Sequence, residues 1–403
     1  MTKKQLSKVS VLGSTGTIGV NTLDVISMHP ERFQVYGLSA FKNVELMFVQ
    51  CQRYLPEIAV MVDPHSAEQL RDRIKLEGLQ VEVRSGEQEV CALAAGLTET
   101  VVCGIVGAAG LMSTLAAVKS GKKVLVANKE PLVMLGDHII ELAQQHGACL
   151  LPLDSEHNAI FQCLPQQPIV DRNGNAAITR EQGIRKILLT GSGGPFRNLA
   201  PELFSEVTPE QACAHPNWVM GRKISVDSAT MMNKGLELIE ASVIFGVEPE
   251  RVEIVVHPQS IMHSMVEYID GTILAQMGSP DMRVPIANAL GWPDRISSGA
   301  EQLDFAHIAR FDFQAPDYDR FPSLVLAESA AEQRGTMPAV LNAANEIAVE
   351  AFLNHQISFD QIPVLVEKTM LASSYSVSTD LDTVLEADVQ SRLICENLIN
   401  GVT

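Results

Sequence analysis

The sequence is short of positive charge. Its 403 residues contain 30 lysines and arginines against 48 aspartates and glutamates, a formal net charge of -18. Because a protein that binds nucleic acid broadly needs a basic face, this balance argues against such a function. An anionic small molecule remains compatible with it, since a few local lysines can hold a phosphate inside an acidic protein.

Paired cysteine motifs are also missing. The seven cysteines, at 51, 91, 103, 149, 163, 213 and 395, form no Cys-x-x-Cys pair. An odd and scattered set is typical of reduced thiols, so we predict a cytoplasmic location rather than a disulfide framework. The opening "MTKKQLSK" leads directly into an apolar strand and does not read as a secretory signal.

Long uninterrupted apolar runs are scarce. Residues 101–118 carry no charge and reach the lower length limit of a membrane span, but Gly104, Gly107 and Gly110 interrupt them. We therefore expect a strand at "VVCGI" and a helix at "LMSTLAAVKSG", and no membrane partner.

The length of the chain requires more than one domain. Strand and helix patterns alternate over residues 1–153, which predicts a doubly wound, Rossmann-like parallel sheet. The loops described below make residues 1–153 the candidate NADPH-binding domain. Residues 154–292 mix short helices with extended runs, and the "DG" in "VEYIDGTILAQ" is a turn signal. This stretch predicts a central α+β catalytic domain with an antiparallel sheet. Residues 293–320 read as a linker, and residues 321–403 as a small helical bundle.

A glycine-rich loop lies near the N-terminus. In "VLGSTGTIGV", Gly13, Gly16 and Gly19 fall between a predicted strand and a predicted helix. This setting predicts a nucleotide site, because glycines let a pyrophosphate approach the helix N-terminus. The next strand, in "QVYGLSAFKN", lacks the terminal acid that binds the ribose of NAD and offers Lys42 and Asn43 instead. This favours NADPH; the alternative for Lys42 is a solvated helix start.

Two carboxylates follow a buried strand in "LLPLDSEHNAIF". Asp154 and Glu156 lie at the strand end where open α/β sheets bind ligands, and oxygen ligands suit Mg²⁺ or Mn²⁺. The alternative is a helix N-cap at Asp154 or Ser155. A capping box is disfavoured, because His157 and Asn158 stand where Glu or Gln would be needed.

A third polar segment is "SVDSATMMNKGLELIEAS". We expect a strand end at "DSAT" and a helix from near Met232, which puts Asn233, Lys234 and Glu237 on one face. That face suits a phosphate-plus-metal site, because lysine is a point charge for phosphate and glutamate is a hard ligand. The alternative is ordinary solvated surface.

Two further loops contain candidate binding residues. In "LLTGSGGPF", backbone amides and Ser192 would form an anion nest, or the glycines form a plain turn. "HPNWVMG" places His215 and Trp218 on a loop, where the tryptophan either covers a ligand as a lid or fills a core.

The motifs "GSTGTIG", "ANKE", "DSEHNAIFQ", "TGSGGPF", "HPNWVMG", "DSATMMNKGLE" and "HPQSIMHSMVE", in this order, resemble the 1-deoxy-D-xylulose 5-phosphate (DXP) reductoisomerase family over essentially the whole chain. The resemblance implies an NADP-dependent oxidoreductase that isomerises and reduces DXP to 2-C-methyl-D-erythritol 4-phosphate in non-mevalonate isoprenoid biosynthesis. It also implies a homodimer that uses NADPH and Mg²⁺ or Mn²⁺, with Co²⁺ as an alternative metal.

The resemblance also implies residue roles. The metal ligands would be Asp154, Glu156 and Glu237, which with Lys129 form the catalytic set. The cofactor contacts would be Thr15, Gly16, Thr17, Ile18, Lys42, Asn43, Asn128, Glu130 and Gly221. The substrate contacts would be Lys129, Ser155, Glu156, Ser192, His215, Trp218, Ser228, Asn233, Lys234 and Glu237.

Two positions depart from the family pattern. Phe41 replaces a usual glycine, so adenosine packing would differ, and Pro131 replaces a small polar residue at a helix start, where proline is harmless. Two other functions compete: a metal-independent NADP-dependent semialdehyde dehydrogenase, for which Cys149 or Cys163 would be the nucleophile, and a non-enzymatic NADP-sensing protein.

Overall fold

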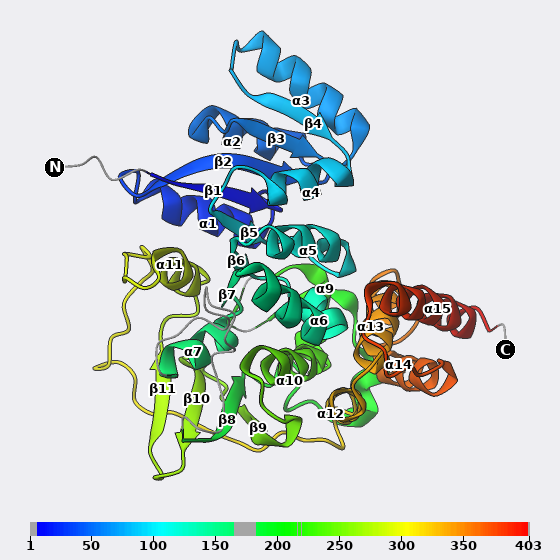
Figure 1. The fold of residues 1–403 in the computed structure, drawn as a ribbon. Coiled ribbons are helices and arrows are strands. Elements are labelled where there is room, and N and C mark those ends of the chain that lie inside the picture. The colour runs from blue at the N-terminus through cyan, green and yellow to red at the C-terminus, as the bar shows by residue number, and fades with distance from the viewer. Residues whose placement is uncertain (1–5, 165–182, 216, 219, 402–403) are drawn as a thin grey trace.

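A seven-stranded parallel sheet forms the N-terminal part of the computed structural model, which describes residues 6–164, 183–215, 217, 218 and 220–401 (Figure 1). The strand order is β4-β3-β2-β1-β5-β6-β7. The strands are β1 (Ser7–Leu12), β2 (Phe33–Ala40), β3 (Ile58–Met61), β4 (Glu82–Ser85), β5 (Thr100–Cys103), β6 (Lys123–Val126) and β7 (Cys149–Pro152). The doubly wound prediction is confirmed. β4 differs from the other strands, since this charged, half-exposed edge strand lacks an apolar run.

Helices join these strands. They are α1 (Thr17–Ser27), α2 (Val44–Tyr54), α3 (Pro64–Leu76), α4 (Glu87–Ala95), α5 (Leu111–Lys119) and α6 (Glu130–His146), and α7 (Ser155–Cys163) follows β7. The uncharged stretch 101–118 is divided between β5 and α5, as expected. Within the described residues, no helix has both the length and the apolar character that crossing a bilayer requires.

The second sheet has four strands in the order β11-β10-β8-β9. They are β8 (Ile184–Gly191), β9 (Val252–Val256), β10 (Met262–Tyr268) and β11 (Ile273–Met277). β10 runs antiparallel to β8 and β11, and Asp270 and Gly271 form the predicted turn. β8 and β9 pair in parallel, so the sheet is mixed and the expectation of an antiparallel sheet was wrong for this pair. The reason is a long helical crossover, which returns the chain to the same end of the sheet.

The crossover contains α8 (Pro209–Ala212), α9 (Arg222–Ala229) and α10 (Met232–Phe245). The segment "DSAT" therefore belongs to a helix, and its expected strand end was wrong. Hydroxyls of Ser225 and Thr230 donate to backbone carbonyls four residues earlier, which makes these short polar side chains compatible with the helix. Met231 adopts a left-handed conformation with φ 63° that separates the two helices, and α10 begins at Met232 as predicted.

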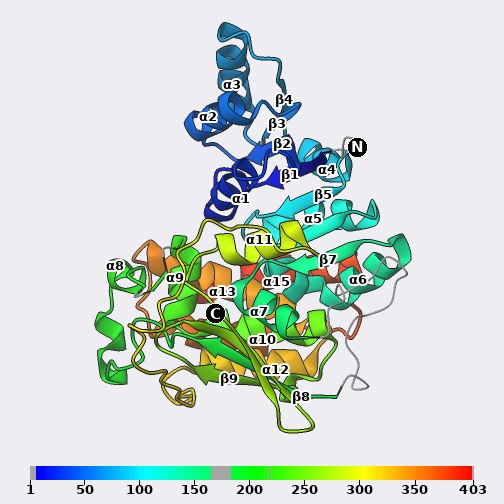
Figure 2. The same ribbon diagram turned by 90° about the vertical axis from the view of Figure 1, so that its left-hand side faces the viewer.

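The remaining helices are α11 (Arg283–Gly291), α12 (Ser323–Gln333), α13 (Met337–Leu353), α14 (Gln361–Ala372) and α15 (Leu381–Ile399). The helical C-terminal region is confirmed. α13 is buried along most of its length, between α6 and α9 on one side and α12, α14 and α15 on the other. The two sheets lie at opposite ends of the molecule with α10 between them, as Figures 1 and 2 both show. The domain boundaries at 153, 292 and 320 stay a prediction.

Helix α1 packs directly on the glycine loop before it. A Cβ atom added at Gly19 would lie 2.3 Å from the Ser14 Cα and 2.5 Å from the Gly13 carbonyl oxygen. At Gly16 the nearest such atom, the same carbonyl oxygen, is 3.4 Å away, an ordinary contact. The last glycine of the loop is therefore required for close packing of the helix.

We expect Gly19→Ala to lower the free energy of unfolding by about 1–3 kcal/mol, because the loop or the helix must move. Urea denaturation of the cofactor-free protein measures this change. Gly16→Ala is the matched control and should cost less than about 1 kcal/mol, the size of a weakened N-cap. Equal losses in the two variants would contradict the packing explanation.

Candidate active site

Many of the predicted site residues follow strands of the N-terminal sheet and lie at the carboxyl ends of those strands. The glycine loop follows β1, Lys42 and Asn43 follow β2, Asn128 to Glu130 follow β6, and Asp154 follows β7. The strand order reverses between β1 and β5. The carboxyl ends of the strands therefore include the topological switch point, where such sheets bind ligands.

The glycine loop is fastened to the end of β2. The Ser14 N–H donates to the Ser39 carbonyl at 2.8 Å, and the Gly13 N–H donates to the Ser39 hydroxyl at 3.2 Å. Gly16 is the N-cap of α1 and offers no side-chain cap, and the first turn of α1 carries no acidic residue. The helix N-terminus is therefore suited to an anion, as predicted for residues 15–18.

The end of β2 carries an exposed cation. The Lys42 ammonium lies 4.9 Å from the centre of the Phe41 ring, within cation–π range, and Phe41 is 61% exposed. The Asn43 side chain accepts the Leu46 N–H at 3.1 Å and so caps α2. Asn43 thus has a structural role of its own beside the predicted cofactor contact.

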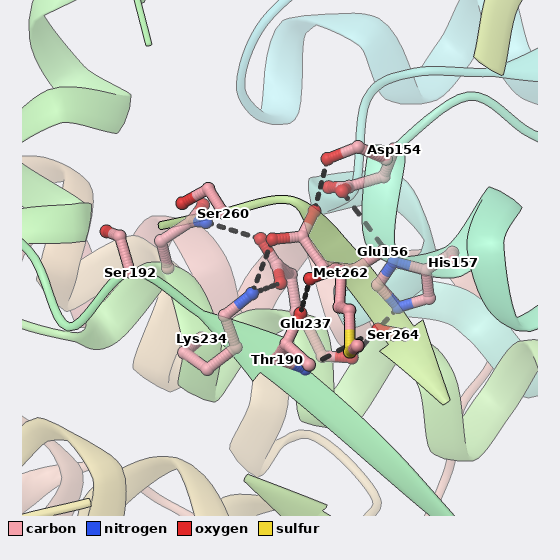
Figure 3. A network of polar contacts seen from close by, with 12 residues as sticks. Asp154, Glu156, His157, Thr190, Ser192, Lys234, Glu237, Ser260, Met262 and Ser264 are labelled. Carbon is pink, nitrogen blue, oxygen red and sulfur yellow. Dashed lines mark hydrogen bonds and ion pairs between the residues drawn. The ribbon is translucent and has the colours of Figure 1, made fainter. Parts of the chain in front are cut away.

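A cluster of acids and lysines lies between the residues that follow β7 and helix α10 (Figure 3). The Lys129 ammonium is 2.6 Å from an Asp154 oxygen and 2.9 Å from a Glu237 oxygen. The Lys234 ammonium is 2.7 Å from a Glu156 oxygen and also bonds Glu237. Two cations therefore bridge the three carboxylates.

Helix α10 presents its polar residues to this cluster. Asn233, Lys234 and Glu237 share one face, as predicted, and the Asn233 amide donates to the Glu237 carboxylate. Lys234 and Glu237 are buried, so the solvated-surface alternative was wrong. Gly191 makes room for the lysine, because a Cβ there would lie 2.7 Å from the Lys234 Cε.

Asp154 occupies the N-cap position of α7, but its side chain makes no capping bond. The carboxylate pairs with Lys129 instead, which favours the ligand-binding reading over the cap. The neighbouring Ser155 hydroxyl donates to Glu156.

Sequence reasoning missed two members of the cluster. Glu240 lies three residues after Glu237 on α10, and one of its oxygens is 3.5 Å from His157 Nδ1. His157 Nε2 donates to the Glu237 carbonyl at 3.0 Å, and both side chains are buried. The i, i+3 spacing of the two glutamates was the available signal.

The cluster holds four carboxylates, two ammonium groups and the imidazole of His157. Burial, reinforced by repulsion from Glu237, raises the pKa of Glu156 to about 7, and burial also raises the pKa of Glu240 to about 7. Burial opposes the charge of His157, but Glu240 and Asp154 outweigh it and raise the pKa of His157 to about 9.

Three of these carboxylates lie close enough together to hold a divalent cation. Single oxygens of Asp154, Glu156 and Glu237 lie within 4.8 Å of one another, and a second group of the same size contains Asp154, His157 and Glu240. The first group offers only oxygen ligands, the donor set that Mg²⁺ and Mn²⁺ prefer.

The glycine-rich loop after β8 carries polar donors. The Ser192 hydroxyl accepts the Gly194 N–H at 3.1 Å and lies 3.0 Å from His215 Nε2. His215 Nδ1 accepts two backbone N–H groups, those of Asn217 and Trp218, so the proton of the neutral ring sits on Nε2. Burial lowers the pKa of His215 to about 4, which keeps this ring neutral.

The loop that precedes α9 borders this site. Trp218 is half-buried, with its ring centre 5.9 Å from that of His263, so the tryptophan neither fills the core nor stands free. Gly221 is the exposed N-cap of α9, and Ser228 lies half-buried near the end of that helix. Residues 216 and 219 of the predicted lid lie outside the described residues.

The cysteines do not support the dehydrogenase alternative. Burial raises the pKa of the Cys163 thiol to about 11, and Cys149 is also buried. All seven cysteines are unbridged. A thiol with a raised pKa is a poor nucleophile, so the acid cluster is the better candidate for chemistry.

Family comparisons cover most of the chain. The model described as 1-deoxy-D-xylulose 5-phosphate reductoisomerase matches residues 9–136, and two C-terminal-domain models of the same reductoisomerase match residues 150–245 and 277–394. The reductoisomerase of Nitrosomonas eutropha is 55% identical over 95% of this chain and 92% of its own length. That of Pseudomonas fluorescens is 51% identical over 98% of both.

Solved structures agree with this result. The reductoisomerase of Zymomonas mobilis in complex with NADPH has a TM-score of 0.89 and 45% identity, over 98% of this chain and 99% of that one. A DOX-P reductoisomerase in complex with NADPH, fosmidomycin and magnesium has a TM-score of 0.93 and 42% identity, over 98% of both chains.

The acid cluster predicts a pH-dependent metal affinity. Glu156 must lose its proton to ligate a cation, and its pKa of about 7 lies between pH 8 and pH 6. We expect Mn²⁺ affinity to fall about tenfold from pH 8 to pH 6, because proton and metal compete for one carboxylate. Electron paramagnetic resonance titration of free Mn²⁺ measures this, and Glu156→Gln should bind weakly at both values. Equal affinity of the wild type at the two pH values would contradict the assignment.

Proposed function

Since the chain belongs to the 1-deoxy-D-xylulose 5-phosphate reductoisomerase family, we propose that Asp154, Glu156 and Glu237 hold the divalent cation of that reaction. The protein is an NADP-dependent oxidoreductase that isomerises and reduces DXP to 2-C-methyl-D-erythritol 4-phosphate for isoprenoid biosynthesis. The observation that carries the metal assignment is the grouping of three carboxylates, one buried and two half-buried, with single oxygens within 4.8 Å of one another.

A bound cation supplies Lewis-acid polarisation of the substrate carbonyl, and NADPH supplies the hydride. The protein's own groups position the substrate and stabilise the charge that develops on it. Although burial opposes its charge, Asp154 and Glu237 hold the pKa of Lys129 well above its usual range. Lys129 is therefore a fixed ammonium beside the metal ligands, where it stabilises negative charge that develops on substrate oxygen.

The substrate phosphate would bind beside Lys234, on the side away from the metal ligands. Ser192, Ser228, Asn233 and Lys234 supply hydroxyl, amide and ammonium donors, and neutral His215 directs its Nε2 proton toward Ser192. Ser155 would contact a substrate hydroxyl beside Glu156. Phosphate binding energy acts far from the reacting carbons and orients them.

Trp218 would lie over the bound substrate as part of a lid. It already borders the site at His263, and the Asn217 amide anchors the same loop to the Pro258 carbonyl at 2.8 Å and the Ser260 hydroxyl at 2.9 Å. Such a cover would exclude water while the aldehyde intermediate is reduced.

The cofactor would lie along the switch-point edge. Residues 15–18 would meet its pyrophosphate, Lys42 and Asn43 its 2′-phosphate, and Asn128, Glu130 and Gly221 its nicotinamide end. The Asn128 amide donates to the Gly107 carbonyl at 2.9 Å and its side-chain oxygen accepts the Glu130 N–H at 3.3 Å, which fixes the turn after β6.

The assembly and location belong to the same proposal. A homodimer is supported by β11, an edge strand on which Ile273 and Leu274 are 50% and 46% exposed. A cytoplasmic location is supported by the seven unbridged cysteines. We keep residues 1–153, 154–292 and 321–403, with the linker 293–320, as the proposed domains.

Turnover of NADPH with DXP, with and without Mg²⁺ or Mn²⁺, tests the metal assignment. We expect Glu237→Gln to lower metal-dependent turnover by about 100-fold or more, because a metal ligand is lost, while NADPH binding changes little. Fluorescence titration with NADPH supplies the second measurement, and exposed Glu202→Gln is the control. Wild-type turnover in Glu237→Gln would remove this residue from the metal site, and a wild type that only binds NADPH would favour the sensing protein.

Replacing Lys42 tests the 2′-phosphate contact. We expect Lys42→Asp to raise KM for NADPH by about 10-fold to 100-fold, the cost of losing a charged hydrogen bond and adding repulsion, with KM for NADH changed far less. Steady-state kinetics with both cofactors measures the ratio. An unchanged preference would place the 2′-phosphate elsewhere.

A further inference from the structure

A second buried ionic cluster lies beside the first, on the cofactor side of α6. The Lys223 ammonium is 3.0 Å from a Glu130 oxygen and 2.8 Å from an Asp227 oxygen. The Glu130 and Asp227 side chains are only 7% and 1% exposed, and the Lys223 side chain is 20% exposed. One lysine of α9 therefore bridges two buried carboxylates on different helices.

The C-terminal helices hold the far side of this cluster. The Asn345 amide of α13 donates to the second Asp227 oxygen at 2.8 Å. The next residue, Glu346, accepts from Arg392 of α15 at 2.6 Å. Glu346 also reaches toward the turn before α5, where a Cβ added at Gly107 would lie 3.1 Å from its carboxylate. Polar contacts thus run from α15 and α13 to the turn that carries Asn128 and Glu130.

Among the described residues, Lys223 is the side chain that pairs with the Glu130 carboxylate. The contact with Lys223 engages one carboxylate oxygen, and burial denies this group compensation by water. Burial opposes the charge of Lys223, but Asp227 and Glu130 outweigh it and hold its pKa above the usual range. Lys223 therefore keeps its charge, and with it the pairing, at neutral pH.

We propose that Lys223 is a positioning residue for the nicotinamide half of NADPH: it fixes the Glu130 carboxylate, and α13 fixes Lys223 through Asp227 and Asn345. The proposal rests on the proposed function, in which Glu130 contacts the cofactor. Lys223 follows Gly221 by two residues, so it also ties the end of the 215–221 loop to the start of α6. The C-terminal helices are then part of the support for the cofactor site.

A double-mutant cycle on NADPH affinity tests this role, because residues that act through one another are not additive. The Kd is measured by NADPH fluorescence without metal or substrate. We expect Lys223→Met to weaken binding about tenfold, the size of a charged hydrogen bond. Glu130→Gln should weaken it similarly, and Lys223→Met/Glu130→Gln should be no weaker than Glu130→Gln alone. Additive losses, or an unchanged Kd in Lys223→Met, would overturn the proposal.

Kinetics separate positioning from a general loss of structure. We expect Lys223→Met to raise KM for NADPH about tenfold and to leave KM for DXP within about twofold, and Lys223→Arg to restore most of the affinity. Lys186→Met is the matched control, since Lys186 also contacts two carboxylates, Glu253 and Glu267, in the four-stranded sheet. An equal rise in KM for NADPH in that control would show a structural effect only and overturn the proposal.

Asn345→Ala is a second variant that tests the same role of Lys223. If Lys223→Met alone does not fold, Asn345→Ala keeps all three charges and removes only the support of Asp227. It should weaken NADPH binding by about threefold, within the range of one neutral hydrogen bond, and an unchanged Kd would overturn the proposal. Absence of NADPH-dependent DXP turnover in the wild type would instead overturn the proposed function.

Discussion

Mutual repulsion among buried carboxylates is the constraint that organises this structure. Asp154, Glu156, Glu237 and Glu240 meet between β7 and α10, where an uncompensated charge would be costly. Two lysines compensate these charges: Lys129 from the start of α6 and Lys234 from α10 itself. Three of the carboxylates still lie close enough together to hold a divalent ion, and a rigid surrounding keeps them in that arrangement.

The surrounding is rigid because α10 is enclosed on nearly every side. Its Gly235 lies against α12, where an added Cβ would be 2.4 Å from that of Ala327, and α6 covers another face. α13 supports α6 and α9 in turn, so the C-terminal helices pack against the elements that carry the site. The second sheet lies against the cluster, and its Gly191 leaves room for the aliphatic part of the Lys234 side chain.

Local patterns predicted what depends on local chemistry. The apolar strands, the glycine loop, the division of residues 101–118, the start of α10 and the shared face of Asn233, Lys234 and Glu237 all follow from periodicity and turn residues. The parallel pairing of β8 with β9 and the partners of His157 and Glu240 depend on contacts between distant segments, which periodicity does not encode. The segment "DSAT" was misread because short polar side chains can bond within a helix, as the hydroxyls of Ser225 and Thr230 do in and just after α9.

The start of α6 joins the two halves of the site. Lys129 and Glu130 are adjacent, buried and oppositely charged, and successive residues of a helix point about 100° apart. Lys129 therefore faces the carboxylates of β7 and α10, while Glu130 faces Lys223 of α9. Pro131, in the first turn, removes an N–H that has no partner within the helix and limits the conformations of this turn. A single helix N-terminus thus sets the distance between the proposed metal and substrate site and the proposed cofactor site. A hydride transfer requires this distance to be constant.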